Sequence, residues 1–293
     1  MGQLRAAVRA YAAQDLPPGE LLGHLDGVVR GLADDTLVTC LYAVYDPVEE
    51  ALCLANAGHL PPVLRTARGV QLLDVGGVLL GAGDRTYEQT EVDFPTDSIL
   101  ALYTDGLVER RSSDIDAGIA SLSALLAAAS GELDDIAASI VESFGDTDEA
   151  DDVALMLVRP HFDRRPRVAR YDVVPHAAMV RDIRQFAVET LTAWGDLEQV
   201  GDHVQLVVSE LVTNVIRHAS GHEATVRLER HDDRIVVAVV DPDARPPRLT
   251  RASVDDESGR GLSLVDAVGD RWGSRHLASG GKIVWCELAA PRR

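Results

Sequence analysis

The sequence predicts a protein of mixed α/β (α+β) class with two domains. Its 293 residues exceed what one compact core usually holds, and 46% of them are hydrophobic, enough for a core in each half. Helical and strand-like patterns occur on both sides of residues 159–170, where two prolines and five arginines interrupt an acidic chain. We therefore expect a domain over residues 1–159, a linker over 160–169 and a second domain over 170–293.

The first domain begins inside a helical pattern. Leu4, Val8 and Tyr11 share one side of a helix with no capping residue ahead of them, which favours a chain that starts within a domain. A second helix is expected over about 18–32, and a turn at Asp46-Pro47 separates two strand-like runs. The other elements expected in this half are strands over 36–46, 50–58, 70–73, 90–94, 98–103 and 153–158, and helices over 116–129 and 132–143.

The second domain shows the same mixture. A strand around 169–174 leads into a helix over 179–194, and a second helix contains residues 207–219. A hairpin follows within 224–241.

The charge balance excludes some partners. Lys and Arg total 28 against 47 Asp and Glu, and a net charge of -19 repels nucleic acid and anionic membranes. No apolar run approaches the ~20 residues of a membrane-spanning helix, and the N-terminus lacks a signal-peptide pattern. Cys40, Cys53 and Cys286 are odd in number and lie in apolar runs, as buried thiols of a reducing compartment do. We expect a soluble cytoplasmic protein.

A polar stripe lies on one predicted helix of the second domain. Glu210, Asn214 and His218 follow one another at a spacing of four among Val, Leu and Ile, so they share one helix face. A carboxylate can order or deprotonate a nucleophile, and an amide oxygen suits Mg²⁺. Alternatively, Glu210 and Asn214 cap a neighbouring loop.

Two further patterns in this domain suit a nucleotide. Asp241 ends an apolar strand, where its carboxylate could accept hydrogen bonds from an adenine amino group. Gly259 and Gly261 bracket Arg260 at the start of an apolar helix, where backbone N–H groups can approach an anion. A Gly-x-Gly pair alone is typical of ordinary turns, but the three patterns in this order are more specific.

With these motifs, residues 170–290 resemble the histidine-kinase-type (GHKL) ATPase module of anti-sigma factor serine kinases. The resemblance implies an α/β sandwich that binds ATP and Mg²⁺, with Glu210 as catalytic base, Asn214 as Mg²⁺ ligand and Asp241 on adenine. It also implies a lid over the phosphates, formed by Gly259, Arg260 and Gly261. A closing hairpin would include Gly280, Gly281 and Lys282.

The loop after Asp241 departs from that family. It reads Asp-Pro-Asp-Ala-Arg-Pro-Pro where the family usually carries glycines. Pro242 and Ala244 restrict a turn that glycine leaves free, which bears on nucleotide affinity.

The first domain carries acidic residues beside predicted strands. Asp105 follows an apolar strand in a turn permitted by Gly106, and Asp151 and Asp152 precede another strand. Carboxylates at strand ends can converge on divalent cations that activate water against a phosphate ester. Asp105 alone would be typical of an ordinary turn.

Together with an Asn-Ala-Gly-His motif at residues 56–59, these motifs resemble the stage-II-sporulation-E branch of the metal-dependent PP2C-like serine/threonine phosphatases, over residues 1–159. The resemblance implies a β-sandwich flanked by helices, with Mn²⁺ or Mg²⁺ held by Asp105 and Asp151 and with Asp152 as an alternative ligand. Asn56 and His59 belong to the signature without an assigned catalytic step.

The sandwich is expected to be incomplete. The family's domain opens with strands that carry an Asp-x-x-Gly motif, whose Asp bridges both metals, and this sequence begins at the helix that should follow that motif. The sequence is therefore either the C-terminal part of a longer phosphatase or a natural product with an incomplete metal site. In both cases we expect weak or no phosphatase activity.

The combination of modules implies a partner-switching regulator of transcription. In the families resembled, the kinase phosphorylates an anti-sigma factor antagonist, the phosphatase reverses this step, and the kinase module binds an alternative sigma factor and often forms a homodimer. Two alternatives remain: a catalytically degenerate scaffold that binds the sigma factor or its antagonist, and a phosphatase regulated by nucleotide, which would need an upstream segment.

Overall fold

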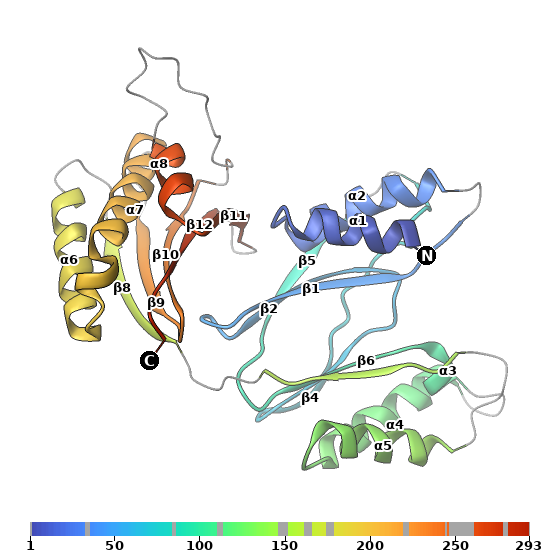
Figure 1. The fold of residues 1–293 in the computed structure, drawn as a ribbon. Coiled ribbons are helices and arrows are strands. Elements are labelled where there is room, and N and C mark those ends of the chain that lie inside the picture. Colours follow the sequence, from blue (N-terminus) through green and yellow to red (C-terminus); the bar gives the residue numbers. More distant parts are fainter. Residues whose placement is uncertain are drawn as a thin grey trace. The chain divides into compact units, whose positions relative to one another are not determined.

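The computed structural model divides into two compact units, residues 1–8 with 18–162, and residues 9–17 with 163–293. Both combine helices with antiparallel sheets, so the predicted α/β (α+β) class is confirmed (Figure 1). None of the described helices is long and apolar enough to cross a membrane. The structure describes residues 2–32, 36–83, 86–109, 114–145, 152–160, 166–173, 179–218, 223–243, 245, 261–277 and 281–292.

Two stacked sheets form the centre of the first unit. Leu54 of one sheet and Leu64 and Leu100 of the other are buried in a common core, since alternate side chains of each strand point inward. One sheet has the order β1-β2-β5, with β1 at Cys40–Asp46, β2 at Ala51–Ala57 and β5 at Gln89–Asp93. The other has the order β4-β3-β6-β7, with β3 at Val63–Thr66, β4 at Gly69–Leu72, β6 at Ile99–Tyr103 and β7 at Leu155–Val158.

Helices cover the outer faces of both sheets (Figure 1). Helix α2 (Pro18–Arg30) packs on the first sheet through a fully buried face that includes Leu21 and Leu25. Helices α4 (Ile115–Ala128) and α5 (Leu133–Phe144) pack on the second. The remaining helices of this part of the chain are α1 (Gly2–Ala12) and the short α3 (Asp105–Val108).

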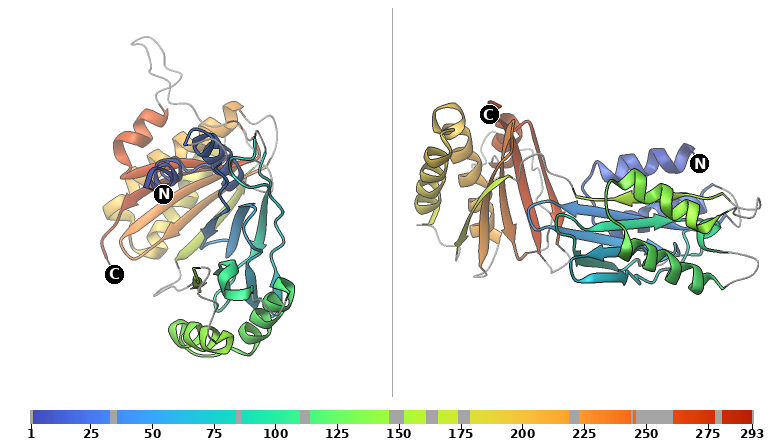
Figure 2. Two further views of the ribbon diagram at one scale, coloured as in Figure 1. Left: turned by 90° about the vertical axis from the view of Figure 1, so that its right-hand side faces the viewer. Right: turned by 90° about the horizontal axis from the view of Figure 1, so that it is seen from below.

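The second unit is a single sheet with helices on one face (Figures 1 and 2). Its helices are α6 (Met179–Trp194), α7 (Leu197–His218) and α8 (Gly261–Val268). The strand order is β11-β12-β10-β9-β8, with β8 at Arg167–Val173, β9 at Ala224–Arg230, β10 at Arg234–Asp241, β11 at Arg271–His276 and β12 at Lys282–Ala289. The core lies between helices and sheet.

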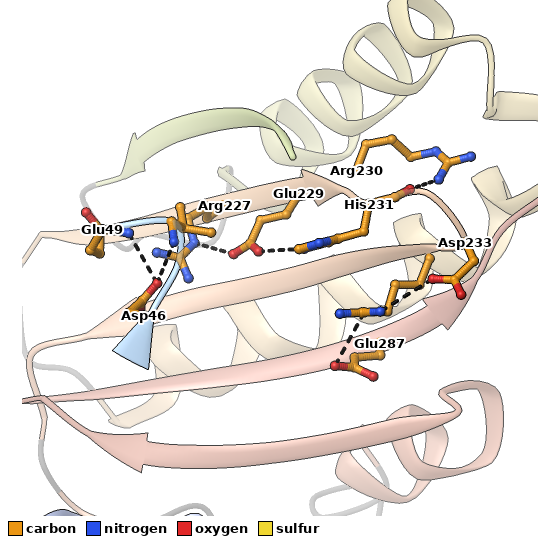
Figure 3. A network of polar contacts seen from close by, with 10 residues as sticks. Asp46, Glu49, Arg227, Glu229, Arg230, His231, Asp233 and Glu287 are labelled. Atoms are coloured by element: carbon orange, nitrogen blue, oxygen red, sulfur yellow. Dashed lines mark hydrogen bonds and ion pairs between the residues drawn. The ribbon is translucent and has the colours of Figure 1, made fainter. Parts of the chain in front are cut away.

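The other face of this sheet carries a row of charges along β9. Val226 and Leu228 point into the core, so Arg227 and Glu229 point to the opposite face. Arg227 Nε lies 2.6 Å from one Glu229 carboxylate oxygen, and His231 Nε2 lies 3.1 Å from the other (Figure 3). Arg227 and His231 therefore contact the Glu229 carboxylate from its two sides.

Several local predictions differ from the structure. Asp105 does not lie in a simple turn: the Glu109 N–H donates to the Asp105 carbonyl at 2.7 Å, which closes one turn of helix α3. Strand β8 begins at Arg167, so the last residues of the predicted linker are paired with β9. Strands β3 and β11 were not predicted as strands. Cys53 and Cys286 are buried as expected, whereas Cys40 is half-buried.

Candidate functional site

Helix α7 positions the predicted catalytic pair of the second unit. Val204, Val208 and Leu211 bury one side of this helix in the core. Glu210 and Asn214, four residues apart, are half-buried beside that apolar side. The predicted stripe therefore lies at the edge of the core, where a ligand could pair with it. The side chain of His218 lies outside the described residues.

The N-terminus of helix α8 lies against this pair. A Cβ atom added to Gly261 would stand 2.5 Å from Glu210 Oε2, so a side chain at this position would displace the Glu210 carboxylate. The structure thus brings Glu210, the predicted catalytic base, next to Gly261 of the predicted lid. Gly259 and Arg260, the other lid residues, lie outside the described residues.

Asp241 is buried at the end of β10, as predicted, and it is already paired. Its Oδ2 lies 2.6 Å from Lys282 Nζ on the adjacent strand β12, and its Oδ1 accepts the Asp243 N–H at 2.9 Å. The Lys282 ammonium also donates to the Asp243 carbonyl at 2.6 Å. Asp241 and Lys282 are only 2% and 6% exposed, so the pair is shielded from water.

The loop after Asp241 is held by polar contacts in place of the family's glycines. Besides its N–H contact with Asp241, Asp243 binds Arg245 through its carboxylate, with Arg245 Nε 2.8 Å from Oδ2. These hydrogen bonds hold the pKa of Asp243 well below its usual range. The start of the departing loop therefore adopts a defined turn.

In the first unit, the structure brings two of the predicted motifs together. Thr104, just before Asp105, accepts the Ala154 N–H at 2.8 Å and donates its hydroxyl to the Asp152 carbonyl at 2.9 Å. Asp105 and Asp152 both lie in this region and are exposed. Asp151, the preferred ligand of the predicted pair, lies outside the described residues.

The Asn-Ala-Gly-His motif forms a closed turn after β2. The Asn56 side chain donates to the His59 carbonyl at 2.8 Å and accepts the His59 N–H at 2.9 Å, while Gly58 adopts a positive φ of 70°. Burial lowers the pKa of the His59 ring, and the negative charge of Asp105 partly opposes this shift. His59 is thus within electrostatic reach of Asp105.

The described side chains of the first unit do not fit a two-metal site. Over the part of the chain that the structure describes, no three His, Cys, Asp or Glu residues lie together as a metal-binding group. Asp105 and Asp152 supply oxygen ligands of the right chemistry, but a two-metal centre needs more of them.

Sequence reasoning placed Lys282 only in the closing hairpin and assigned no role to Thr104. Lys282 opposes Asp241 because β10 and β12 pair in register across 41 residues of sequence, and only the glycines before Lys282 signalled a strand start there. Thr104 directly precedes Asp105 in the sequence, but its bonds to residues 152–154 depend on β6 pairing with β7.

Comparisons with known proteins agree with both halves. Residues 1–161 match the family model of stage II sporulation protein E, and residues 173–287 match that of the histidine kinase-like ATPase domain. An uncharacterized protein of Streptomyces coelicolor is 49% identical over 86 residues, which cover 28% of this chain and 81% of that protein.

Two solved structures are similar to this chain in whole or in part. The crystal structure of the RsbU and RsbW domains of a Mycobacterium tuberculosis protein is similar over 100% of this chain and 81% of that chain, with a TM-score of 0.50 and 21% identity. The PP2C domain of SiaA from Pseudomonas aeruginosa is similar over 54% of this chain and 66% of that chain, with a TM-score of 0.46 and 20% identity. The first similarity shows that the two units share their fold with a two-domain protein.

Proposed function

The chain belongs to the stage II sporulation protein E family, and from this premise we propose that it is a partner-switching regulator of an alternative sigma factor. Its phosphatase-type domain precedes an ATPase-type domain in one chain. A serine kinase and a serine phosphatase catalyse opposite changes of one phosphoserine, so their fusion suits a switch. The proposed substrate is a serine of an anti-sigma factor antagonist, and the proposed partner is the sigma factor itself, in the bacterial cytoplasm.

The proximity of Glu210 and Gly261 carries the kinase half of this proposal. Glu210 would accept the proton of the substrate serine hydroxyl. The serine oxygen would form a bond to the γ-phosphorus of ATP, while the bond from this phosphorus to the bridging oxygen breaks and ADP leaves. The lid residues Gly259, Arg260 and Gly261 would cover the phosphates at the start of α8, whose N-terminus favours negative charge.

Asn214 and Asp241 would hold the nucleotide. The Asn214 amide oxygen is a hard ligand suited to Mg²⁺, and it lies one helical turn from Glu210 on α7. Mg²⁺ would neutralise phosphate charge. Asp241 would bind the base at the end of β10.

For the phosphatase half, we propose weak or no activity of these 293 residues. Among the described residues, only Asp105 and Asp152 belong to the metal-ligand set predicted for this half, and we derive no hydrolytic step from them. Incubation of the chain with Mn²⁺ and a phosphoserine-containing antagonist checks this: release of phosphate at a rate that Asp105→Asn abolishes would contradict it.

The first experiment is a calorimetric titration of the purified chain with ATP and Mg²⁺. We expect saturable binding that weakens at least tenfold in Asn214→Ala. Gln205→Ala is the matched control, because Gln205 is a half-buried polar residue of the same helix outside the stripe, and this variant should bind as the wild type does. Equal binding by both variants would contradict the assignment of Asn214.

A second candidate function is a scaffold that binds the sigma factor or its antagonist without catalysis. The ion pair between Asp241 and Lys282 favours it, because the carboxylate proposed for adenine is already satisfied in part. Absence of ATP binding, together with stable capture of a sigma factor or antagonist, would support this scaffold. Light scattering of the purified chain would test the homodimer that the kinase half is proposed to form.

A further inference from the structure

Lys282 is a buried cation beside the residue proposed to read the base, and no role has been derived for it. We propose that Asp241 and Lys282 act together as a hydrogen-bond acceptor and donor for a purine ring, so that the site accepts guanine nucleotides as well as adenine nucleotides. This inference rests on the proposed nucleotide binding and deepens it.

The pair is built into the sheet. Asp241 and Lys282 are opposite each other in the antiparallel ladder of β10 and β12. Gly281, just before Lys282, has a positive φ of 82°, and a Cβ there would stand 2.4 Å from the Asp241 carbonyl oxygen. The backbone thus fixes the Lys282 side chain next to the Asp241 carboxylate.

The pair retains hydrogen-bonding capacity. A lysine ammonium has three N–H donors, and the described contacts of Lys282 use two of them, on Asp241 and on the Asp243 carbonyl. A carboxylate has about four acceptor positions, and the described contacts of Asp241 are with Lys282 and the Asp243 N–H. Both side chains are more than nine-tenths buried, where unused polar capacity is costly, so a ligand that completes it gains affinity.

In its described contacts, Lys282 meets the carboxylate of Asp241 and not that of the neighbouring Asp243. The carboxylate of Asp243 is bound by Arg245, with nitrogen to oxygen distances of 2.5 to 3.0 Å, and only its backbone carbonyl contacts Lys282. Lys282 therefore makes its carboxylate contact with Asp241, while Arg245 binds the carboxylate of Asp243.

The chemistry of the two bases fits such a pair. Adenine presents an amino donor at position six, whereas guanine presents an oxygen acceptor there. A lone carboxylate repels that oxygen, and a site built around one group rejects the other base strongly. Beside Asp241, the Lys282 ammonium can donate to guanine O6 while Asp241 accepts from guanine N1–H. With adenine, Asp241 accepts from the amino group, and this contact does not need Lys282.

The test is a titration of the full chain with ATP and with GTP, each with Mg²⁺. We expect dissociation constants within about tenfold of each other in the wild type. In Lys282→Met, which keeps length and removes charge, the preference for ATP should rise by about ten- to a hundredfold, the range of a hydrogen bond to a buried charged group. Asn214→Ala should weaken both nucleotides by a similar factor. An unchanged preference in Lys282→Met would make the pair purely structural and overturn the inference.

A second measurement needs no variant, in case Lys282→Met does not fold. Inosine triphosphate carries the six-position oxygen and N1–H of guanine without its two-amino group, and the wild-type chain should bind it within about tenfold of ATP. Binding of ATP more than a hundredfold tighter than both GTP and inosine triphosphate would overturn the inference and leave the proposed function standing. Binding of none of the three would overturn both.

Discussion

The Glu210 carboxylate of α7 touches the position where a side chain would begin at Gly261, the first residue of α8: a Cβ there would lie 2.5 Å from Glu210 Oε2. The atom met is the tip of a flexible side chain, so a larger residue would displace the carboxylate without breaking the helix packing. The glycine therefore matters for where the proposed base lies more than for folding.

Gly261→Ala is the first prediction. We expect the melting temperature to change little, because Glu210 can rotate away, while phosphotransfer falls by about a hundredfold, as a displacement of about 1 Å in a reacting group can cause. The measurement is transfer of phosphate to an antagonist protein, beside a thermal melt. An active Gly261→Ala enzyme with wild-type rates would show that Glu210 does not need this position.

The matched control for this variant is Gly27→Ala. Gly27 lies within α2, with no heavy atom within 4 Å of an added Cβ. Alanine in a helix interior is about 1 kcal/mol more favourable than glycine. The control should thus be slightly more stable and transfer phosphate normally.

The sequence patterns predicted the elements with strong periodicity and missed those without it. The bounds of α6 agree with the prediction from residue 179 to residue 194, and Asp241 ends β10 as expected. Strand β11 was missed because Arg271–His276 has no run of β-branched residues and alternates little. Both family resemblances are confirmed by the matched ranges.

The sequence predicted which residues belong to the candidate site. It did not predict which of them contact each other. The ion pair of Asp241 with Lys282 follows from strand register, which single-sequence patterns leave undetermined between distant strands. Asp105 was placed in a turn because Gly106 permits one, but the hydrogen bond from the Glu109 N–H closes a helical turn there. The contacts that the sequence did not predict are therefore those that depend on pairing between distant strands.

A second prediction concerns a buried ion pair that joins the turn before α7 to β9. Arg230 Nε lies 2.9 Å from Asp196 Oδ2, and both side chains are at most 6% exposed. Asp196→Asn should lower the free energy of unfolding of this unit by about 3 kcal/mol, because it leaves a buried guanidinium without its counter-charge. Tryptophan fluorescence in urea measures this unit alone, since the three tryptophans, Trp194, Trp272 and Trp285, all lie in it.

The control for the buried pair is an exposed pair in the same unit. Arg292 lies 3.8 Å from Asp233, with side chains 85% and 47% exposed. Exposed pairs contribute about 0–1 kcal/mol, so Asp233→Asn should scarcely shift the urea midpoint. Equal shifts in the two variants would contradict the difference that burial predicts.

A third prediction concerns Thr104, which connects the loop of Asp105 to residues 152–154. Thr104→Val removes both hydroxyl contacts, each of which contributes about 1 kcal/mol. We expect faster hydrogen exchange at the Ala154 amide by mass spectrometry, and near wild-type exchange in Thr104→Ser, which keeps the hydroxyl. If Thr104→Val exchanges no faster than Thr104→Ser, the hydroxyl does not hold these segments together.

The last prediction uses Tyr103, which is 3% exposed and donates its hydroxyl to the Pro61 carbonyl at 2.8 Å. Burial raises the pKa of Tyr103 from 10.0 to about 12. An acid whose pKa is higher in the folded state stabilises the fold fully below the unfolded pKa, and this stabilisation is lost as pH rises from about 10 to about 12. At pH 7, Tyr103→Phe should therefore be less stable than the wild type by about 1 kcal/mol, the net value of one hydrogen bond. At pH 11 the difference in stability should shrink, because only the wild type has the tyrosine hydroxyl that ionises in this range.

Urea unfolding followed by circular dichroism at both pH values measures this difference. A stability difference of the same size at pH 7 and pH 11 would show that Tyr103 does not resist ionisation in the folded chain.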